Sequence, residues 1–274
     1  MMRRTKADRH VLEVSEAELS RQTEELDALH HDECLPALGS SVQEWIEVNR
    51  ERGAEDRSAG AISRRGLLLG TGAAAIGGVL LAACSSGSGR STTTTAAGGG
   101  AAAAASLTGD LKVAGLAASL ENLGVYTYDA GIRAARAGRL GSVPPAVVTF
   151  ATTAMGQHQQ HAAAWNSVLT GAGKRAVTET DPRLRPTVDR MFGKVTDVAG
   201  LAELALEIEN IAAQTYQAGI GVLSSTKAIK TAASIQPVEM QHAAILNLVL
   251  GTYPVPYAFN PTSNARSTSD LGSR

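Results

Sequence analysis

The feature of this chain that most limits its fold is an internal duplication. Residues 121–132 (ENLGVYTYDAGI) return as residues 209–220 (ENIAAQTYQAGI), and residues 158–169 (HQQHAAAWNSVL) return as residues 239–250 (EMQHAAILNLVL). In each copy a glutamate is followed by a tyrosine seven positions later, and the second segment begins with a histidine or a glutamate that is followed by a histidine three positions later. This pattern predicts a duplicated helical hairpin that carries metal-ligand residues.

The periodicity of these segments predicts that their polar residues face inward. In a helix, positions i, i+3, i+4 and i+7 share one face. The faces around Glu121 and Glu209 are otherwise built from small and apolar residues together with Tyr128 and Tyr216. His161 and His242 lie on similar apolar faces, and His158 and Glu239, three positions earlier, flank the same stripes.

Three inward glutamates need compensation. A carboxylate buried among apolar groups costs several kcal/mol unless it is paired or binds a metal. The basic residues of this region fall near helix ends or in loops; they are Arg133, Arg136, Arg139, Lys174 and Arg175. A bound cation is therefore the favoured compensation, with a hydrogen-bonded polar network as the alternative. Tyr128 and Tyr216 are either core aromatic residues or partners of the metals.

The pattern of ligand-type residues resembles a known family. One glutamate from each of two helices and a Glu-x-x-His from each of the other two is the di-iron pattern of ferritin-like four-helix bundles. Over residues 108–252 the chain resembles the rubrerythrins and bacterioferritins. The resemblance implies terminal ligands at Glu121 and Glu209, a bridging Glu239, and histidine ligands at His161 and His242. It also implies that Tyr128 and Tyr216 lie near the metals as catalytic residues, and that the bundle handles Fe(II), O₂ or peroxide as a ferroxidase or peroxidase.

One position departs from the family pattern. His158 stands where the first Glu-x-x-His would have its glutamate, which leaves three carboxylates against the four positive charges of two divalent ions. Imidazole and carboxylate together suit several first-row metals. We therefore expect one or two ions, with iron, in mononuclear or di-iron form, favoured over manganese or zinc. The alternative is a structural or partner-binding protein whose metal site has decayed.

The predicted fold is all-α: a four-helix bundle made of two duplicated hairpins. We expect helices at 109–138, 144–170, 197–223 and 226–251, with a long crossover at 171–196. Pro237, two positions before Glu239, predicts a kink or a helix restart. Residues 253–274 are expected to form an extended tail.

A second set of signals precedes the bundle. Residues 63–69 (SRRGLLL) resemble a twin-arginine export motif, and the apolar run behind them ends in Leu81-Ala82-Ala83-Cys84, which is similar to a lipobox. Cys84 would then be lipidated, and residues 85–107 would be a flexible linker. This predicts a lipoprotein on the extracytoplasmic face of the cell membrane, with an uncleaved anchor as the alternative. Arg64 and Arg65 place the N-terminal side in the cytoplasm.

Residues 1–62 are long for such a leader. We expect a cytoplasmic-side extension that is partly helical or disordered, with short amphipathic helices at 16–29 and 41–52, or else a start codon placed too far upstream. His30 and Cys34 have the H-x-x-x-C spacing of zinc-type anti-sigma factors, but Ala37 stands where a further cysteine is expected. With 25 basic and 26 acidic residues and 4% aromatic residues, the chain has no nucleic-acid signature. The oligomeric state stays open, and a homodimer is one option.

Overall fold

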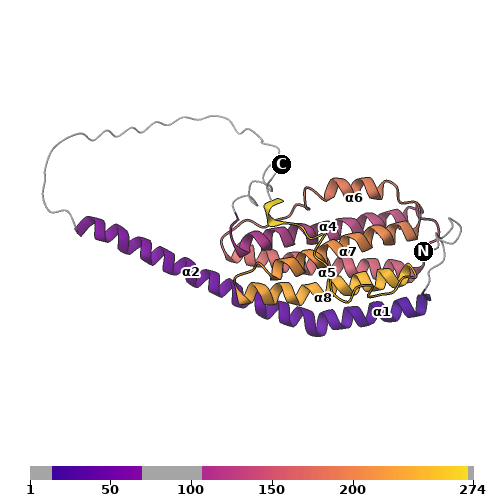
Figure 1. Cartoon of the computed structure of the whole chain (residues 1–274), viewed down its shortest axis with the longest axis horizontal. Helices are drawn as coiled ribbons and strands as arrows, with labels where there is room; N and C mark the ends of the chain where they lie inside the picture. Colours follow the sequence, from indigo (N-terminus) through magenta and orange to yellow (C-terminus); the bar gives the residue numbers. More distant parts are fainter. Residues whose placement is uncertain (1–13, 70–106, 271–274) are drawn as a thin grey trace, which may run out of the picture.

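The computed structural model describes residues 14–69 and 107–270, and every regular element in these ranges is a helix. Four long helices lie side by side as a bundle (Figure 1): α4 (Asp110–Arg136), α5 (Pro145–Gly171), α7 (Val198–Ile220) and α8 (Thr226–Val249). The predicted all-α bundle is confirmed. Each helix lies within a few residues of its expected range.

The turns of the two hairpins follow from local chemistry. After α4, Gly138 and Gly141 have φ values of 69° and 72°, a left-handed conformation that favours glycine. Pro144 then precedes α5, where a proline fits the first turn of a helix. At the other hairpin, the Asp110 carboxylate accepts hydrogen bonds from the backbone N–H of Ser224 (2.9 Å) and Ser225 (2.8 Å). This contact ties the beginning of α4 to the turn between α7 and α8.

The crossover contains a helix that the sequence did not predict. Helix α6 (Arg185–Phe192) lies along the outer side of α4 and α7 (Figure 1). It has a proline in its first turn, and Val188 is the one buried residue among its eight. Asp181 holds the preceding turn by accepting from the N–H groups of Arg183 (2.9 Å) and Leu184 (2.8 Å).

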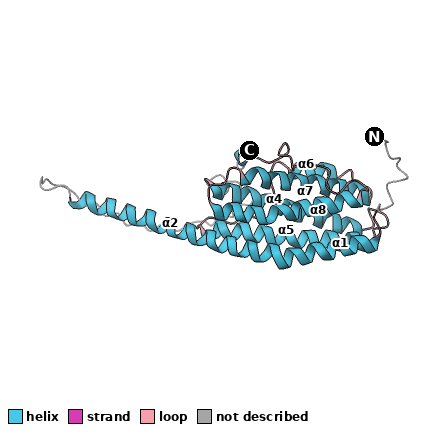
Figure 2. Cartoon of the chain, turned by 60° about the horizontal axis from the view of Figure 1, so that its bottom comes forward, coloured by secondary structure: helices cyan, strands magenta, loops and turns pink. Residues whose placement is uncertain are grey.

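The N-terminal residues pack against the bundle. Helix α1 (Glu16–Leu29), a π-helical turn (His30–Cys34) and α2 (Leu35–Leu69) follow one another along α5 and α8, and α2 then extends beyond the bundle (Figures 1 and 2). The expected segment 16–29 matches α1, whereas 41–52 is part of a much longer helix. Among the described residues of this extension, six apolar side chains are buried: Val14, Leu19, Leu26, Leu38, Val42 and Trp45.

The structure describes only part of the predicted export signal. Residues 63–69 form the last turns of α2, while residues 70–84, including Cys84, and the linker that follows lie outside the described residues. Across residues 14–69 and 107–270, none of the helices combines the length and the apolar content that a membrane crossing needs.

Two features near the C-terminus complete the fold. Helix α8 continues through Pro237 instead of restarting there, so that alternative was wrong. The tail returns to α7, where the backbone N–H of Asn264 donates to Gln214 Oε1 and that of Arg266 donates to Thr215 Oγ1, both at 2.8 Å.

The packing of the extension can be tested at Trp45. Its side chain is 1% exposed and meets the Trp165 ring edge-on, with the ring centroids 6.0 Å apart. We expect Trp45→Ala to lower the free energy of unfolding of the whole chain, residues 1–274, by about 3–5 kcal/mol, because it leaves a cavity between α2 and α5. Urea denaturation measures this. Leu29→Ala, at a 44% exposed position of α1, is the control and should change little; equal effects of the two substitutions would contradict the packing.

Candidate metal centre

The six predicted ligands meet in the middle of the bundle. Every one of the four bundle helices contributes: α4 and α7 one residue each, α5 and α8 two each. The side chains are at most 1% exposed; they are Glu121, His158, His161, Glu209, Glu239 and His242. The duplicated pattern thus brings all the expected residues together.

These residues form two overlapping groups of potential ligands. Glu121 and His161 belong to the first group, and Glu209 and His242 belong to the second. His158 and Glu239 are members of both, and within each group the ligand atoms lie within 4.8 Å of one another. Two ions held by these groups would share His158 and Glu239. Glu239 is the residue for which the resemblance implies a bridging role.

His158 connects the two outer carboxylates. Its Nδ1 lies 2.8 Å from Glu121 Oε2, and its Nε2 lies 3.2 Å from Glu209 Oε1. Each ring nitrogen therefore faces a different site. A glutamate at this position would place its two oxygens in a similar way, but with a negative charge.

The charges of the cluster shift its pKa values strongly. Burial lowers the pKa of His158, but the charges of Glu239 and Glu209 outweigh burial and hold it well above its ordinary value. Burial likewise opposes ionisation of Glu121, yet His161 and His158 lower its pKa to about 2. In the metal-free state the cluster therefore favours carboxylates paired with imidazolium groups. A metal that binds through these histidines must displace their protons.

Several buried polar atoms of the cluster have no hydrogen-bond partner. They are Glu209 Oε2, Glu239 Oε2, His161 Nε2 and His242 Nδ1. An unpaired buried polar atom costs about 1–3 kcal/mol, and more when it is charged. His242 Nε2 donates to Gln157 Oε1 at 2.8 Å, which leaves Nδ1 facing Glu209 Oε1, 3.4 Å away. In the metal-free state a proton on Nδ1 compensates this carboxylate, and a cation that displaced the proton would meet the same two ligand atoms, so the residues fit a metal.

Each of the two tyrosines donates a hydrogen bond to a glutamate of the other hairpin. Tyr128 OH donates to Glu209 Oε1 at 2.5 Å, and Tyr216 OH donates to Glu121 Oε1. Burial and the adjacent glutamates raise the pKa of both tyrosines well above the ordinary value. Each phenol therefore keeps its proton and holds one outer carboxylate in place. Trp165 Nε1 in turn donates to Tyr216 OH at 2.6 Å.

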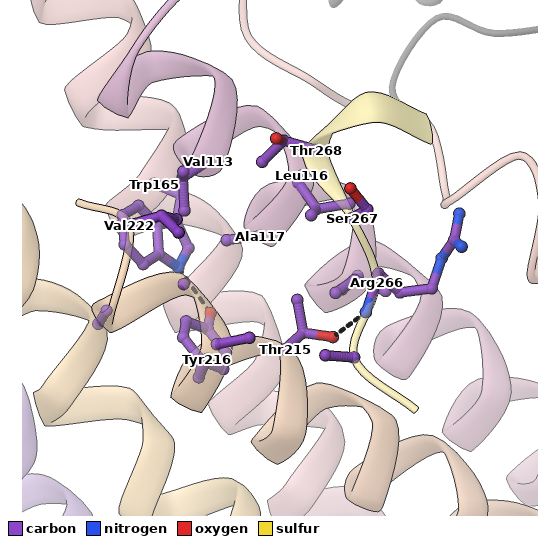
Figure 3. A pocket seen from close by; sticks show the side chains of 15 residues that line it. Val113, Leu116, Ala117, Trp165, Thr215, Tyr216, Val222, Arg266, Ser267 and Thr268 are labelled. Carbon is purple, nitrogen blue, oxygen red and sulfur yellow. Dashed lines mark hydrogen bonds between the residues drawn. The ribbon is translucent and has the colours of Figure 1, made fainter. Parts of the chain in front are cut away.

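The surroundings of the two tyrosines differ. Tyr216 and Trp165 line a cavity of about 250 Å³ between α4, α7 and the tail, whose residues 265–268 form one wall (Figure 3). The cavity beside Tyr128 is only about 30 Å³. A small molecule thus has room on one side of the centre, next to the phenol that binds Glu121.

Sequence reasoning missed the outer partners of the histidines. Gln157 accepts from His242 and donates through Nε2 to Asp27 Oδ1 of α1 at 3.2 Å. The duplicated position holds Val238, so the repeat contains no signal for Gln157. Cys34, also from the extension, has its Sγ within 4.8 Å of a ring nitrogen of His161. Asp27 and Cys34 are far from the ligands along the chain, and no pattern in the sequence links them to these residues.

Gly124 makes space for His158. A Cβ at this position would lie 2.8 Å from Cγ and Nδ1 of the His158 ring, closer than real contacts allow. The second copy of the repeat has Ala212 in place of Gly124 and Glu239 in place of His158. The imidazole and the glycine therefore form a matched pair that replaces glutamate and alanine.

This pairing predicts a compensating double variant. Alone, Gly124→Ala should lower the free energy of unfolding by about 1–3 kcal/mol, because the methyl group overpacks against the His158 ring. Combined with His158→Glu, it should cost at least about 1 kcal/mol less, since the carboxylate can turn away and alanine favours helix. Urea denaturation of both single variants and the double variant measures the coupling. Additive effects would contradict the pairing.

Comparison with known proteins identifies the family. The family model described as "Ferritin-like domain" matches residues 109–252, just over half of the chain. No match was found among curated proteins or solved structures. The match covers all four bundle helices and all six residues of the buried cluster, and the chain belongs to the ferritin-like domain family.

Proposed function

We propose that the bundle binds two metal ions and uses them to handle Fe(II), O₂ or peroxide. The observation that carries this proposal is the pair of overlapping buried ligand groups sharing His158 and Glu239. Each group offers two carboxylates and two imidazoles, and several of their buried atoms have no other partner. Such a mixed ligand set suits iron, and also manganese or zinc. Iron supplies the redox chemistry that the proposed substrates require.

The residues of the chain have distinct roles in this proposal. Glu121 with His161, and Glu209 with His242, hold one ion each, while Glu239 bridges the two. Tyr216 and Tyr128 orient the outer carboxylates through their hydrogen bonds. The cavity beside Tyr216 provides room for a small substrate next to the phenol that orients Glu121.

We expect the two ions to bind with unequal affinity. Three carboxylates leave one positive charge uncompensated when two divalent ions are present, and only Glu239 can bridge them with oxygen atoms. Two cations a few ångströms apart repel strongly in a buried site. The first ion therefore binds tightly and the second more weakly, which makes the centre a weaker oxidase than one with four carboxylates.

A structural role is the second candidate, and one observation favours it. His158 already joins Glu121 and Glu209 through its two nitrogens, as an imidazolium would in a bundle without metal. In that case the cluster holds the four helices in register, and the protein serves as a structural or partner-binding ferritin-like protein. Metal content separates this candidate from the first.

Metal analysis of the purified uncut chain tests the proposal. We expect wild type to bind iron. The double variant Glu121→Ala/Glu209→Ala and the single variant Glu239→Ala should each lower the bound iron content at least tenfold at limiting metal. Even residues that only hydrogen-bond to metal ligands change metal affinity by about 10–100-fold when they are replaced. His158→Glu should raise occupancy towards two ions and speed Fe(II) oxidation. Glu207→Ala removes an exposed glutamate of α7 and is the matched control. Equal metal content in all variants would favour the structural candidate.

We also propose export and anchoring at the membrane. The twin-arginine-like residues 63–69 and the lipobox-like residues 81–84 support this. Cleavage before Cys84 would remove α1 and α2 and uncover α5 and α8, including Trp165. The docked extension therefore belongs to the uncut chain, and the twin-arginine route, which carries folded proteins, fits a precursor that folds before export.

Lipid labelling tests this second proposal. In a host with the export pathway, the membrane-bound protein should incorporate labelled fatty acid and have the mass of residues 84–274 plus lipid. Cys84→Ala should abolish the label, and replacing Arg64 and Arg65 by lysine should retain the uncut chain in the cytoplasm. A membrane-bound form that still contains Trp45 would contradict cleavage.

A further inference from the structure

A second group of metal-ligand residues lies where the extension meets the bundle. His30 and Cys34 come from the turn between α1 and α2, and His161 comes from α5. One ligand atom from each lies within 4.8 Å of the others. His161 is thus common to this group and to the centre described above, while the other two residues have no role there as ligands.

The backbone brings His30 and Cys34 onto one face. Residues 30–34 form a π-helical turn, in which the N–H of Leu35 bonds to the carbonyl of His30. The wider turn aligns residues four positions apart more closely than an α-helix does, and such turns occur often at functional sites. The turn also inserts His30 towards α5, where its side chain is 1% exposed.

Both histidines present an unpartnered nitrogen to this group. His30 Nε2 bonds to Gln160 Oε1 at 2.7 Å, which leaves the buried Nδ1 without a partner. His161 Nδ1 faces Glu239 Oε1 at 3.1 Å, which leaves the buried Nε2 without a partner. The two rings are in contact, with their centroids 5.1 Å apart and their planes at 67°. Two imidazole nitrogens without hydrogen-bond partners therefore lie beside one thiol, and together they offer three ligands to one metal ion.

Cys34 is accessible from outside this group. Its side chain is half-buried, and its Sγ donates to the carbonyl oxygen of Ser234 at 3.1 Å. That carbonyl lies in the turn of α8 where Pro237 removes a helical hydrogen bond. A cavity of about 290 Å³ is lined by His30, Cys34 and Pro237, among others. An ion can therefore approach the sulfur through the gap between the extension and α8.

We propose that His30, Cys34 and His161 bind a third metal ion, of the borderline or soft class to which Zn²⁺ belongs. Thiolate and imidazole are the ligands that such ions prefer over Mg²⁺ or Ca²⁺. On binding, the Cys34 thiol loses its proton to solvent and the sulfur–metal bond forms. Three protein ligands leave a fourth position that faces the cavity. When the neighbouring centre is also filled, His161 would release its remaining ring proton to solvent and would bridge both sites through its two nitrogens.

The consequence is a metal-dependent link between the extension and the bundle. Two of the ligands belong to the extension and one belongs to α5, so an ion bound here holds α1 and α2 against the bundle. Cleavage before Cys84 would remove His30 and Cys34 together, so the site exists in the uncut chain. This proposal does not depend on whether the six-residue centre is an oxidase.

Cobalt absorption tests the proposal on the uncut chain. Cys84→Ser is used as the parent, which leaves Cys34 as the only thiol of the chain. Titration with Co²⁺ should produce a near-ultraviolet sulfur-to-cobalt charge-transfer band whose final amplitude corresponds to one thiolate-bound ion per chain and which disappears when Zn²⁺ is added. In the same background Cys34→Ser should abolish the band, and His30→Gln should weaken the affinity by at least about tenfold.

Two controls separate this site from the six-residue centre. Glu209→Ala should lower total cobalt but leave the charge-transfer band intact, because Glu209 belongs to the group that lacks His161. Glu33→Ala, at an exposed position of the same turn, should change neither quantity. Circular dichroism confirms that each variant is folded. Absence of the band in a parent that binds cobalt, or a band of unchanged affinity in His30→Gln, would overturn the proposal.

Discussion

The structure depends on compensating six ionisable side chains in the centre of a helical bundle. Three carboxylates and three imidazoles are at most 1% exposed, and their ion pairs join them to one another. Buried charges of this number are tolerated only when every one is paired or bound to a cation. Each surrounding hydrogen bond contributes to this, from the two crossing tyrosines to Gln157 on His242. Folding and any metal chemistry therefore rely on the same set of contacts.

The duplication gives the two halves of the centre the same layout, and the differences between the copies make the two halves unequal. The exchange of glutamate for His158 is accommodated by Gly124, which leaves the space that an imidazole ring needs. Among the described residues, the cavity beside Tyr216 measures about 250 Å³ and the one beside Tyr128 about 30 Å³. Each difference is small, but together they make the two halves of the centre chemically distinct. A symmetric centre would bind two ions with equal affinity. In this centre the two halves differ in the contacts of their ligands, and the half beside Tyr216 lies next to the larger cavity.

The N-terminal extension connects to the centre in two ways. Its apolar residues, with Trp45 against Trp165, cover the face formed by α5 and α8. Its polar residues reach the histidine ligands and their partners: Asp27 accepts from Gln157, and Cys34 Sγ lies within 4.8 Å of a ring nitrogen of His161. Because outer partners orient metal ligands and tune their basicity, the presence of the extension must affect the centre. A chain without α1 and α2 would contain the same six residues in a different environment.

The sequence by itself determined the four bundle helices and which residues face inward, because helical periodicity is a local property that repeats in both copies. It also identified all six members of the buried cluster, since ligand-type residues on apolar faces have few alternatives. The tertiary structure decided which residues touch. Tyr128 lies seven positions from Glu121 yet bonds to Glu209, because the two hairpins pack face to face. Helix α6, the docking of α1 and α2, and the meeting of Cys34 with His161 likewise arise from contacts between distant segments, for which no local pattern exists.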